Sequence, residues 1–598
     1  MSDPHHVDAV EAGLSQWGEN ASSLLQILIH IQQCLGHIPD SAVELLSHRL
    51  EVEPSVIDGV VTFYSFLSHE PLGRYDIRFS DNIIDRMLGS RECAEQLMKQ
   101  LGVEAGKTDA GKGVTIDYTS CTGMGDQGPA ALVNGLTLTR LTPERVDAIA
   151  DLVKSETPVD AWPRDFFSVD ENLVAGDILL DDWYHPGAAT QAVQSIGKST
   201  ILEQLETSGL RGRGGAGFSA GMKWRFCAEA QARQKVVVCN ADEGEPGTFK
   251  DRLLLQSYAD RLFEGMTLCA AVIGAQKGFL YLRGEYRYLV EPLEAELQKR
   301  RDANLLGDAI LGQEGFDFDI RIHLGAGAYI CGEESALIES LEGERGVPRI
   351  RPPFPVTHGY LGCPTVVNNV ETFIAAAGVA ENGPEWLRSR GTEVSPGTKL
   401  LSVSGDCDKP GIYEIPFGMT IAEILDLCGA SDTQAVQVAG PAGVMLAPAE
   451  FNRKIAYEDV ATGGSFMVFD NSRDLVEVAR NFMDFFVHES CGFCTPCRVG
   501  TSLVNRLLGK IGNGHGTTVD LETIQRMASA MRNTSHCGLG ATASNPAVNL
   551  IEHFPTMLYD RLLHTSFEPS FDLDAALEEA RQVTGRDDPG AHLQGGGV

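Results

Sequence analysis

Three cysteines at two-residue intervals constrain this chain more than any other feature of its sequence. They are Cys491, Cys494 and Cys497, in the stretch ESCGFCTPCRVG. A local disulfide would leave one thiol over, and a tetrahedral zinc site usually draws on two separated pairs, whereas a four-iron cluster commonly takes three close cysteines and a remote fourth. Cys537, in TSHCGLGA, is the candidate for the fourth ligand. The spacing favours a four-iron cluster over zinc.

Composition bounds the kind of molecule that carries this motif. A chain of 598 residues exceeds what one hydrophobic core usually supports, so about three to five domains are expected. The formal net charge of −34 opposes binding to nucleic acid or to anionic membranes, and no apolar run is long enough to insert into a bilayer. No export signal is recognisable at the amino terminus, so the fourteen cysteines are expected to be thiols or metal ligands of a cytoplasmic protein.

Hydrophobic periodicity divides the first two thirds of the chain. Residues 1–70 show apolar residues at helical spacing and predict a helical bundle, whereas 71–154 combine strand and helix patterns into a small α/β unit. Residues 155–195, rich in Pro, Asp and Trp, are interpreted as a linker. Buried-strand patterns in KVVVCNA, GFLYLRG and FDIRIHLG predict a parallel sheet with crossover helices over 196–394.

In the last third of the chain, the pattern of apolar residues changes twice. Short strand patterns around one helical segment predict a compact unit over 395–472. Residues 473–565 are predicted to be helical and to carry the cysteine motif, and 566–598 form a tail whose end, AHLQGGGV, is expected to be disordered. The fold class that follows is multidomain α/β.

One glycine-rich stretch of the α/β region indicates anion binding. GLRGRGGAGFSAGMKW (209–224) lets the backbone turn sharply and point amide N–H groups at a ligand, and Arg211, Arg213 and Lys223 supply positive charge. Its spacing fits neither nucleotide fingerprint, and a merely flexible loop is the alternative. The two arginines and the strand pattern that follows favour phosphate binding.

Two acidic segments accompany this loop. VVVCNADEGEPGTFKDR runs from a buried strand into polar residues, where ligands of open α/β sheets bind, although an acidic turn that caps a helix explains the pattern equally well. GAGAYICGEESALIESLEG places Glu333 and Glu334 at a helix start, where they either stabilise the helix alone or accept hydrogen bonds from ribose hydroxyls.

Taken in order, these motifs resemble a known family. GLRGRGGAGF, CNADEGEPGTFKDR, GAGAYICGEESAL, VNNVET and ESCGFCTPCRVG with CGLG are similar to the NADH-binding flavoprotein subunit of respiratory complex I over about 196–565. The same module occurs in NAD-reducing and bifurcating hydrogenases and in NAD-dependent formate dehydrogenases. The resemblance implies a Rossmann-like domain for FMN and NAD(H), a β-grasp-like domain and a helical domain with one [4Fe–4S] cluster.

The resemblance also implies roles for individual positions. Around FMN it places Gly212, Arg213, Gly214, Gly215, Lys223, Asn240, Asp242, Gly332, Asn368, Asn369 and Thr372. Beside the adenine of NADH it places Phe218, Phe226 and Phe354, and beside the nicotinamide and ribose Glu243, Glu245, Glu333 and Glu334, with Glu245 as the catalytic residue. Cys491, Cys494, Cys497 and Cys537 are its cluster ligands.

The amino-terminal part resembles the small companion subunit of complex I, a helical bundle followed by a thioredoxin-like domain that binds a [2Fe–2S] cluster through four cysteines. The matching positions here are Ser80, Asp85, Cys121 and Gly125. Because one ligand of four remains, this second cluster is expected to be absent; whether Cys121 still holds a metal is open.

The fusion of both modules in one chain is typical of the diaphorase subunit of NAD-reducing nickel–iron hydrogenases. Expected partners are therefore an iron–sulfur electron-transfer subunit and hydrogenase subunits, with no nucleic acid and no direct membrane insertion. A complex I or formate dehydrogenase module is the alternative. An electron-relay scaffold without enzymatic activity and a zinc-binding nucleic-acid module are the rivals from other classes, and the charge of −34 opposes the latter.

Overall fold

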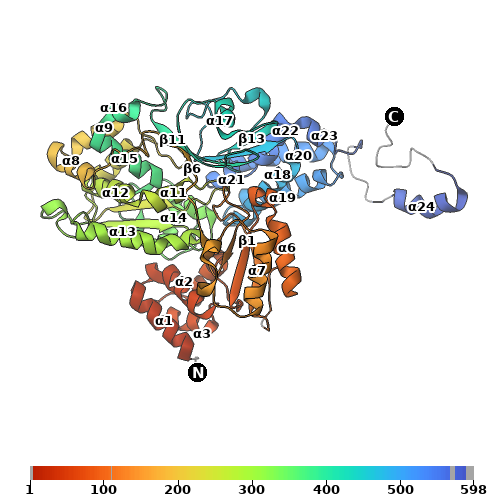
Figure 1. Cartoon of the computed structure of the whole chain (residues 1–598), viewed down its shortest axis with the longest axis horizontal. Coiled ribbons are helices and arrows are strands. Elements are labelled where there is room, and N and C mark those ends of the chain that lie inside the picture. Colours follow the sequence, from red (N-terminus) through yellow and green to blue (C-terminus); the bar gives the residue numbers. More distant parts are fainter. Residues whose placement is uncertain (1–3, 110, 566–570, 572, 588–598) are drawn as a thin grey trace. The chain divides into compact units, whose positions relative to one another are not determined.

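The computed structural model describes residues 4–109, 111–565, 571 and 573–587 (Figure 1). Their contacts divide the chain into two compact units, Met1–Gly440 with Pro448–Asp470 and Pro441–Ala447 with Asn471–Val598. Among the described residues, no helix has the length and apolar character that crossing a bilayer requires.

The first unit begins with the predicted helical bundle, formed by α1 (Pro4–Trp17), α2 (Leu24–Leu35), α3 (Asp40–Leu50) and α4 (Pro54–Phe63) (Figure 1). Gly36 ends α2 in the left-handed conformation, at φ 75°, which glycine adopts without steric cost. Pro54 starts α4 at a position where its missing N–H leaves no bond unmade.

A five-stranded sheet follows, in the order β2-β3-β1-β4-β5. Its elements are β1 (Tyr75–Ser80), α5 (Ile83–Met87), α6 (Ser90–Leu101), β2 (Lys107–Asp109), β3 (Val114–Thr119), β4 (Ala131–Val133), β5 (Leu136–Leu138) and α7 (Pro143–Lys154). β1 pairs with β3 in parallel and with β4 antiparallel. Tyr75, Ile77 and Phe79 alternate along β1 into a core shared with α6 and α7.

Residues 155–195, interpreted from sequence as a linker, are packed into this unit. Trp162 and Phe166 belong to the core of the five-stranded sheet, whereas Leu179 and Trp183 belong to the core of the α/β region that follows. The segment also contributes β6 (Leu173–Ala175) and α8 (Ala188–Ile196). Its apolar residues are divided between two cores, so no single periodicity shows in the sequence.

The α/β region is built on the predicted parallel sheet, in the order β10-β7-β8-β9. Its strands are β7 (Val236–Ala241), β8 (Lys277–Leu282), β9 (Asp319–Leu324) and β10 (Thr365–Asn369), the last of which was not expected from sequence. The helices are α9 (Lys198–Ser208), α10 (Ala220–Glu229), α11 (Lys250–Ser257), α12 (Ala259–Ile273), α13 (Val290–Asp302), α14 (Glu334–Leu341), α15 (Val370–Asn382) and α16 (Pro384–Arg388).

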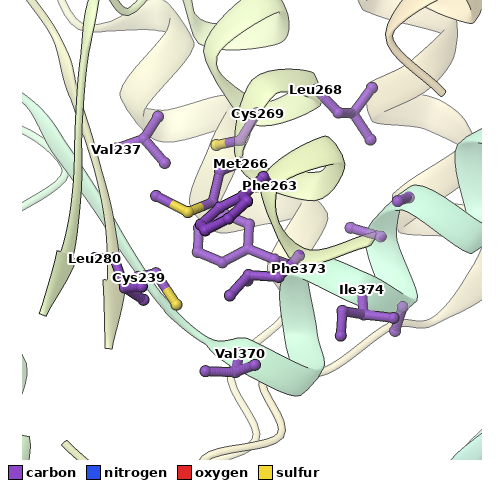
Figure 2. Close-up of a cluster of buried hydrophobic side chains, with 14 of the residues drawn as sticks. Val237, Cys239, Phe263, Met266, Leu268, Cys269, Leu280, Val370, Phe373 and Ile374 are labelled. Carbon is purple, nitrogen blue, oxygen red and sulfur yellow. The ribbon is translucent and has the colours of Figure 1, made fainter. Parts of the chain in front are cut away.

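Helices α12 and α15 pack on this sheet through a cluster of buried apolar side chains (Figure 2). Phe263 and Met266 of α12 meet Phe373 of α15 beneath Val237 of β7 and Leu280 of β8. A Cβ at Gly265 would lie 2.1 Å from the Phe373 carbonyl oxygen, so a glycine there allows the two helices to approach closely. This core fixes the strand ends that carry the polar residues described below.

The first unit closes with a third sheet, whose strands run in the order β13-β15-β11-β12-β6. They are β11 (Thr398–Gly405), β12 (Gly411–Pro416), β13 (Thr433–Val438) and β15 (Ser465–Asp470), and they accompany α17 (Ile421–Cys428). Thr420 and Glu423 form a capping box that starts α17. Short strands around one helix were predicted; the pairing of β6 with β12 was not.

The second unit is helical, as predicted for the region of the cysteine motif. It contains β14 (Val444–Leu446), α18 (Leu475–Glu489), α19 (Thr495–Gly512), α20 (Thr518–Thr534), α21 (Gly538–Thr542), α22 (Asn545–His553) and α23 (Pro555–Tyr559). Within the predicted tail, α24 (Leu573–Thr584) is helical. The predicted disorder of AHLQGGGV lies outside the described residues.

Candidate functional site

Polar residues from distant parts of the sequence meet at the carboxyl edge of the parallel sheet. Asn240 lies near the end of β7, and Asn368 and Asn369 end β10, the strand paired with it. Asn369 also caps α15, because its side chain accepts a hydrogen bond from the Glu371 N–H at 3.1 Å. Ligands of open α/β sheets bind at this edge, which makes it the candidate site.

The glycine loop between α9 and α10 lies against these strand ends. A Cβ on Gly214 would come within 3.3 Å of the Asn369 Cβ, so the loop backbone passes directly over β10. Gly215 has φ 118° and Gly217 has φ 66°, backbone conformations that residues with a side chain rarely adopt. The Gly212 N–H donates to the Phe218 carbonyl at 2.8 Å, which closes the loop on itself.

Two of the three cationic residues of this stretch, Arg213 and Lys223, were assigned to FMN, and they differ in their contacts. The Arg213 guanidinium is buried, donates to the Pro396 carbonyl at 3.0 Å and lies 4.8 Å from the Phe417 ring centroid, so its side chain anchors the loop to the protein. Its backbone N–H donates to Thr372 Oγ1 at 2.9 Å. Lys223 Nζ remains at the sheet edge, where it donates to the Val367 carbonyl at 2.9 Å.

Asn240, Asp242 and Gly332 form a second wall of this edge. Asn240 Nδ2 donates to the Gly332 carbonyl at 2.7 Å, and Asn240 Oδ1 accepts from the Asp242 N–H at 3.2 Å. A Cβ on Gly332 would lie 3.3 Å from Asp242 Oδ2. The structure therefore brings these three predicted residues together. Because Gly332 has no side chain, the space beside the Asp242 carboxylate is not filled from this position.

Glu243 and Glu245, neighbours in the acidic segment, have different surroundings. Glu243 accepts hydrogen bonds from the Asp251 N–H at 2.6 Å and from Tyr286 Oη at 2.8 Å, and burial raises the pKa of its carboxyl group to about 7. It thus holds the start of α11, as the capping alternative for this segment suggested. Glu245 accepts a hydrogen bond from Tyr329, which lies in the GAGAYICGEESALIESLEG motif but was given no role there.

Glu333 and Glu334 are both paired with cations. Glu333 caps α14 by accepting from the Ser335 and Ala336 N–H groups, and its other oxygen lies 3.1 Å from Arg351. Glu334 accepts from Lys223 at 2.7 Å and lies 3.6 Å from Arg351. Because two cations compensate these two carboxylates, the net charge of this group of four side chains is close to zero. Glu333 and Glu334 alone would repel an extra phosphate on the ribose, and the two cations weaken that repulsion.

The three predicted aromatic contacts are unusually exposed. Phe218, Phe226 and Phe354 are 50%, 43% and 52% exposed, whereas most phenylalanines in the described chain fill its cores. Exposed rings near a glycine loop are available for stacking on planar groups. The described contacts do not show these rings touching one another.

Sequence reasoning missed a buried charge network beneath this edge. Lys250 lies 2.6 Å from Asp251 and 3.0 Å from Glu371, and Lys399 of β11 also donates to Glu371. All four side chains are at most 2% exposed. Asn369 joins the network by donating to Asp251 at 2.6 Å. Lys250 and Asp251 lie in the quoted CNADEGEPGTFKDR motif, and this position is the sequence feature that could have indicated their part in the network.

The predicted cluster ligands lie in the second unit, around the starts of two helices. Cys491 and Cys494 lie between α18 and α19, Cys494 is the N-cap of α19, Cys497 is in its first turn, and Cys537 is the N-cap of α21. Burial raises the pKa of the Cys497 thiol to about 11, and the charges of the other three cysteines add to the shift. The other three thiols therefore lie within electrostatic reach of Cys497.

A glycine allows the two cysteine segments to approach. A Cβ on Gly540 would lie 3.0 Å from the Cys497 Cβ and 2.6 Å from Ser535 Oγ, so the turn that follows Cys537 packs directly on α19. Across the described residues, no group of three or more His, Cys, Asp or Glu side chains is arranged to hold a metal ion. Three of the four thiols lie at helix starts, where N–H groups stabilise negative charge, and the set nevertheless suits an anionic iron–sulfur cluster.

The four positions of the thioredoxin-like domain do not fit a [2Fe–2S] cluster. Ser80 Oγ donates to Asp85 Oδ2 at 2.6 Å, and the other oxygen of Asp85 accepts from the Ala130 N–H at 2.9 Å. Both side chains are fully buried in this network. Cys121 is buried, and Gly125 offers no ligand atom. The donor set thus consists of one thiol among hydrogen-bonded oxygens, which does not match the usual Cys₄ ligation.

Comparison with known proteins identifies three family segments. Residues 10–154 match the thioredoxin-like [2Fe–2S] ferredoxin family, 205–377 match the Nuo51 FMN-binding domain, and 477–561 match the iron–sulfur binding region of NADH-ubiquinone oxidoreductase F. The predicted order of a thioredoxin-like, an FMN-binding and a four-iron segment is confirmed.

Individual relatives match either nearly the whole chain or a part of it. The NAD-reducing hydrogenase HoxS subunit alpha of Cupriavidus necator is 44% identical over 579 residues, which are 94% of this chain and 96% of the relative. An NADH-quinone oxidoreductase subunit of Rhizobium meliloti is 39% identical, and the match covers 64% of this chain and 94% of that relative. A chain in the crystal structure of an NAD⁺-reducing [NiFe]-hydrogenase in the H₂-reduced state superposes with a TM-score of 0.88 at 43% identity, covering 96% of this chain and 99% of that chain.

The sheet-edge site, the cysteine motif and the three matched segments define a flavin- and iron–sulfur-binding oxidoreductase subunit. Its segments extend beyond those of the complex I flavoprotein, because the thioredoxin-like part is fused to it in the same chain. The chain belongs to the family of the diaphorase subunits of NAD-reducing hydrogenases.

Proposed function

We propose that this chain exchanges hydride between NAD(H) and FMN and passes electrons singly through one [4Fe–4S] cluster to or from partner subunits. The observation that carries the proposal is the convergence of the glycine loop, Asn240 and Asn369 at the carboxyl edge of the parallel sheet. When bound there, FMN supplies the conversion between two-electron hydride transfer and one-electron transfer. The protein supplies binding and orientation.

The chain's own residues divide this work. The loop N–H groups and Lys223 hold the phosphate and ring of FMN, while Asn240 and Asp242 present polar atoms to it. Glu245 and Tyr329, joined by their hydrogen bond, orient the nicotinamide end of NADH. Phe218, Phe226 and Phe354 are the exposed rings that suit the adenine.

Cys491, Cys494, Cys497 and Cys537 are proposed as ligands of the [4Fe–4S] cluster. All four lie in one unit, with Cys494, Cys497 and Cys537 at helix starts and Cys491 in the connection before α19, which supports the assignment. In the thioredoxin-like domain, the side chains at Ser80 and Asp85 support the expectation that no [2Fe–2S] cluster is bound, although the segment resembles a ferredoxin.

The partners are proposed to be the remaining subunits of an NAD-reducing nickel–iron hydrogenase. Nearly the whole chain aligns with the hydrogenase subunit of Cupriavidus necator, whereas the NADH-quinone oxidoreductase subunit of Rhizobium meliloti covers 64% of it. This difference favours the hydrogenase assembly over the complex I module. Pull-down of the tagged native chain followed by mass spectrometry tests it, and recovery of quinone-reductase subunits would contradict it.

The enzymatic part of the proposal is tested with purified, anaerobically prepared protein. We expect bound FMN, and NADH-dependent reduction of ferricyanide, and we expect Glu245→Gln to keep FMN while lowering kcat/KM for NADH roughly tenfold or more. Glu393→Gln, at an exposed position outside the motifs, is the control. A colourless protein that does not take up FMN, or unchanged kinetics in Glu245→Gln, would refute the assignment.

A further inference from the structure

The first unit contains a cavity of about 700 Å³ that none of the proposed flavin or NAD residues line. Its walls come from α2, from β1 and the β4–β5 hairpin, from the η4 turn (Gly284–Leu289) after β8, and from the end of β9. It thus lies where the helical bundle, the thioredoxin-like sheet and the α/β region meet. Ligand pockets of about 300–1,000 Å³ are common at such junctions.

The alternation of β1 explains why this cavity is polar on one side. Tyr75, Ile77 and Phe79 point into the core beneath α6 and α7, so the residues between them face the opposite side of the sheet. Those residues, Asp76 and Arg78, line the cavity. Strand β1 therefore has one apolar face and one charged face.

The cavity has more positive than negative charge, in a protein whose net charge is −34. Its lining includes Arg74, Arg78 and Arg287 against one carboxylate, that of Asp76. Arg78 is bound to Asp76 at 2.9 Å, and Arg74 is bound at 2.8 Å to the exposed Glu156 outside the cavity.

Arg287 has no such partner among the described residues. Its one hydrogen bond reaches the Asn134 carbonyl at 3.5 Å, near the limit for such a bond, and burial lowers the pKa of its guanidinium. A partly buried guanidinium without a carboxylate is costly for a fold to maintain. Asp76 Oδ1 is likewise buried without a hydrogen-bond donor. Among the described residues that line it, the cavity thus offers one guanidinium, that of Arg287, without a carboxylate partner.

Much of the remaining lining is apolar and includes Ile29, Leu35, Phe66, Leu72, Leu136 and Leu324. Phe66 supports the Arg78 guanidinium, whose centre lies 5.1 Å from its ring centroid. We propose that this cavity binds a small organic anion, with its phosphate or carboxylate group on Arg287 and its apolar body against these side chains. A guanidinium recognises both anions through paired N–H donors, so either group fits.

Isothermal titration of the FMN-loaded full chain at saturating NAD⁺ tests the proposal, because NAD⁺ blocks the nucleotide site. The probes are naphthyl phosphate and naphthoate, which share a ring and differ in the anion, with inorganic phosphate as a third probe. We expect at least one aromatic probe to bind with one site per chain, and inorganic phosphate to bind roughly tenfold or more weakly because it lacks the apolar body. Which aromatic probe binds distinguishes the phosphate from the carboxylate source.

Two variants tie the binding to this cavity. Arg287→Gln should weaken it roughly tenfold or more, the usual effect of losing a charged hydrogen bond, and Leu72→Trp should abolish it by filling the space. Arg233→Gln, at an exposed site elsewhere, is the matched control, and an unchanged melting temperature and ferricyanide activity show that each variant is folded. Failure of both aromatic probes to bind the wild type, or wild-type binding by either cavity variant, would overturn the proposal.

Discussion

At the residue scale, the candidate site depends on buried charges that satisfy one another. Glu371 accepts from Lys399 and from the Leu400 N–H at 3.0 Å and lies 3.0 Å from Lys250. Removing one partner of such a group leaves other buried charges uncompensated, which typically costs about 3–5 kcal/mol. Because Lys399 lies on β11 and Glu371 on α15, this network joins a helix of the α/β region to the sheet that contains β11.

Glu371→Gln is therefore expected to destabilise the first unit by about 3–5 kcal/mol. The measurement is the shift of the urea midpoint of that unit, followed by tryptophan fluorescence. Glu104→Gln breaks an exposed pair with Lys107 and should change stability by about 1 kcal/mol at most. Equal effects of the two substitutions would show that the buried network does not stabilise the fold.

A buried histidine makes stability depend on pH. His323 of β9 stacks on Tyr281 at 5.6 Å, and burial lowers its pKa from 6.5 to about 3. The unfolded chain therefore binds a proton at this residue between about pH 6.5 and pH 3 that the folded chain does not, so stability falls as the pH falls through this window. From neutral pH to about pH 5 the expected loss is about 2 kcal/mol.

His323→Phe, which keeps the stacked ring, should reduce this acid sensitivity. The measurement compares the fall in melting temperature between about pH 7 and pH 5 in the variant and in the wild type. The control is His48→Gln, because His48 is exposed and its substitution should leave the pH profile unchanged. A variant that loses stability with acid as steeply as the wild type would contradict the assignment.

At the scale of elements, segments with strong local periodicity were predicted correctly from sequence, whereas segments whose side chains are divided between two cores were not. The apolar runs of β7 and β8 are nearly continuous because both sheet faces are covered there, whereas the edge strand β9 alternates apolar residues with the exposed Asp319 and Arg321; all three were found from sequence. β10 has five residues and ends in two asparagines, so its sequence was recognised as part of a motif and was not predicted to be a strand. Residues 155–195 divide their side chains between two cores, and this is visible only in three dimensions.

The candidate site divides in the same way. Cys491, Cys494 and Cys497 are recognisable because they are close together in sequence, and the cysteine spacing also leads to Cys537. Tyr329 and Lys399 reach their partners through tertiary contacts, between residues that are 84 and 28 positions apart; Tyr329 lies in a quoted motif that does not reveal its partner, and no local pattern marks Lys399. The pairing of Glu333 with Arg351 is of the same kind.

The close packing of α21 on α19 yields a prediction for the cluster. Gly540→Ala would place a methyl group 3.0 Å from the Cys497 Cβ and 2.6 Å from Ser535 Oγ, so it should displace a ligand and lower the iron content of anaerobically purified protein. Gly538→Ala, in the same short helix, meets nothing within 4 Å and should keep its iron. Iron analysis and the visible absorption of the cluster measure both; equal iron in the two variants would contradict the predicted ligand geometry.

At the scale of the whole molecule, the proposed functions fall into separate units. The sheet-edge site lies in the first unit and the four cysteines lie in the second, so flavin binding and cluster binding can be lost independently. The thioredoxin-like domain adds a third case: it keeps its fold while the positions that match cluster ligands carry a hydrogen-bond network, because Ser80 and Asp85 satisfy each other in the buried space.

This separation predicts two different outcomes for one cysteine variant. Cys494→Ala should keep its FMN and its reduction of ferricyanide by NADH, because this oxidant accepts electrons directly from the flavin, but should lose NADH-dependent electron transfer within the complex purified with its partner subunits. Cys363→Ala, a cysteine outside the motif, should retain both activities. If Cys494→Ala still transferred electrons to its partners, the cluster would not lie on the electron path. If it lost FMN as well, the flavin and cluster sites would depend on each other, because a change in the second unit would have disrupted the first.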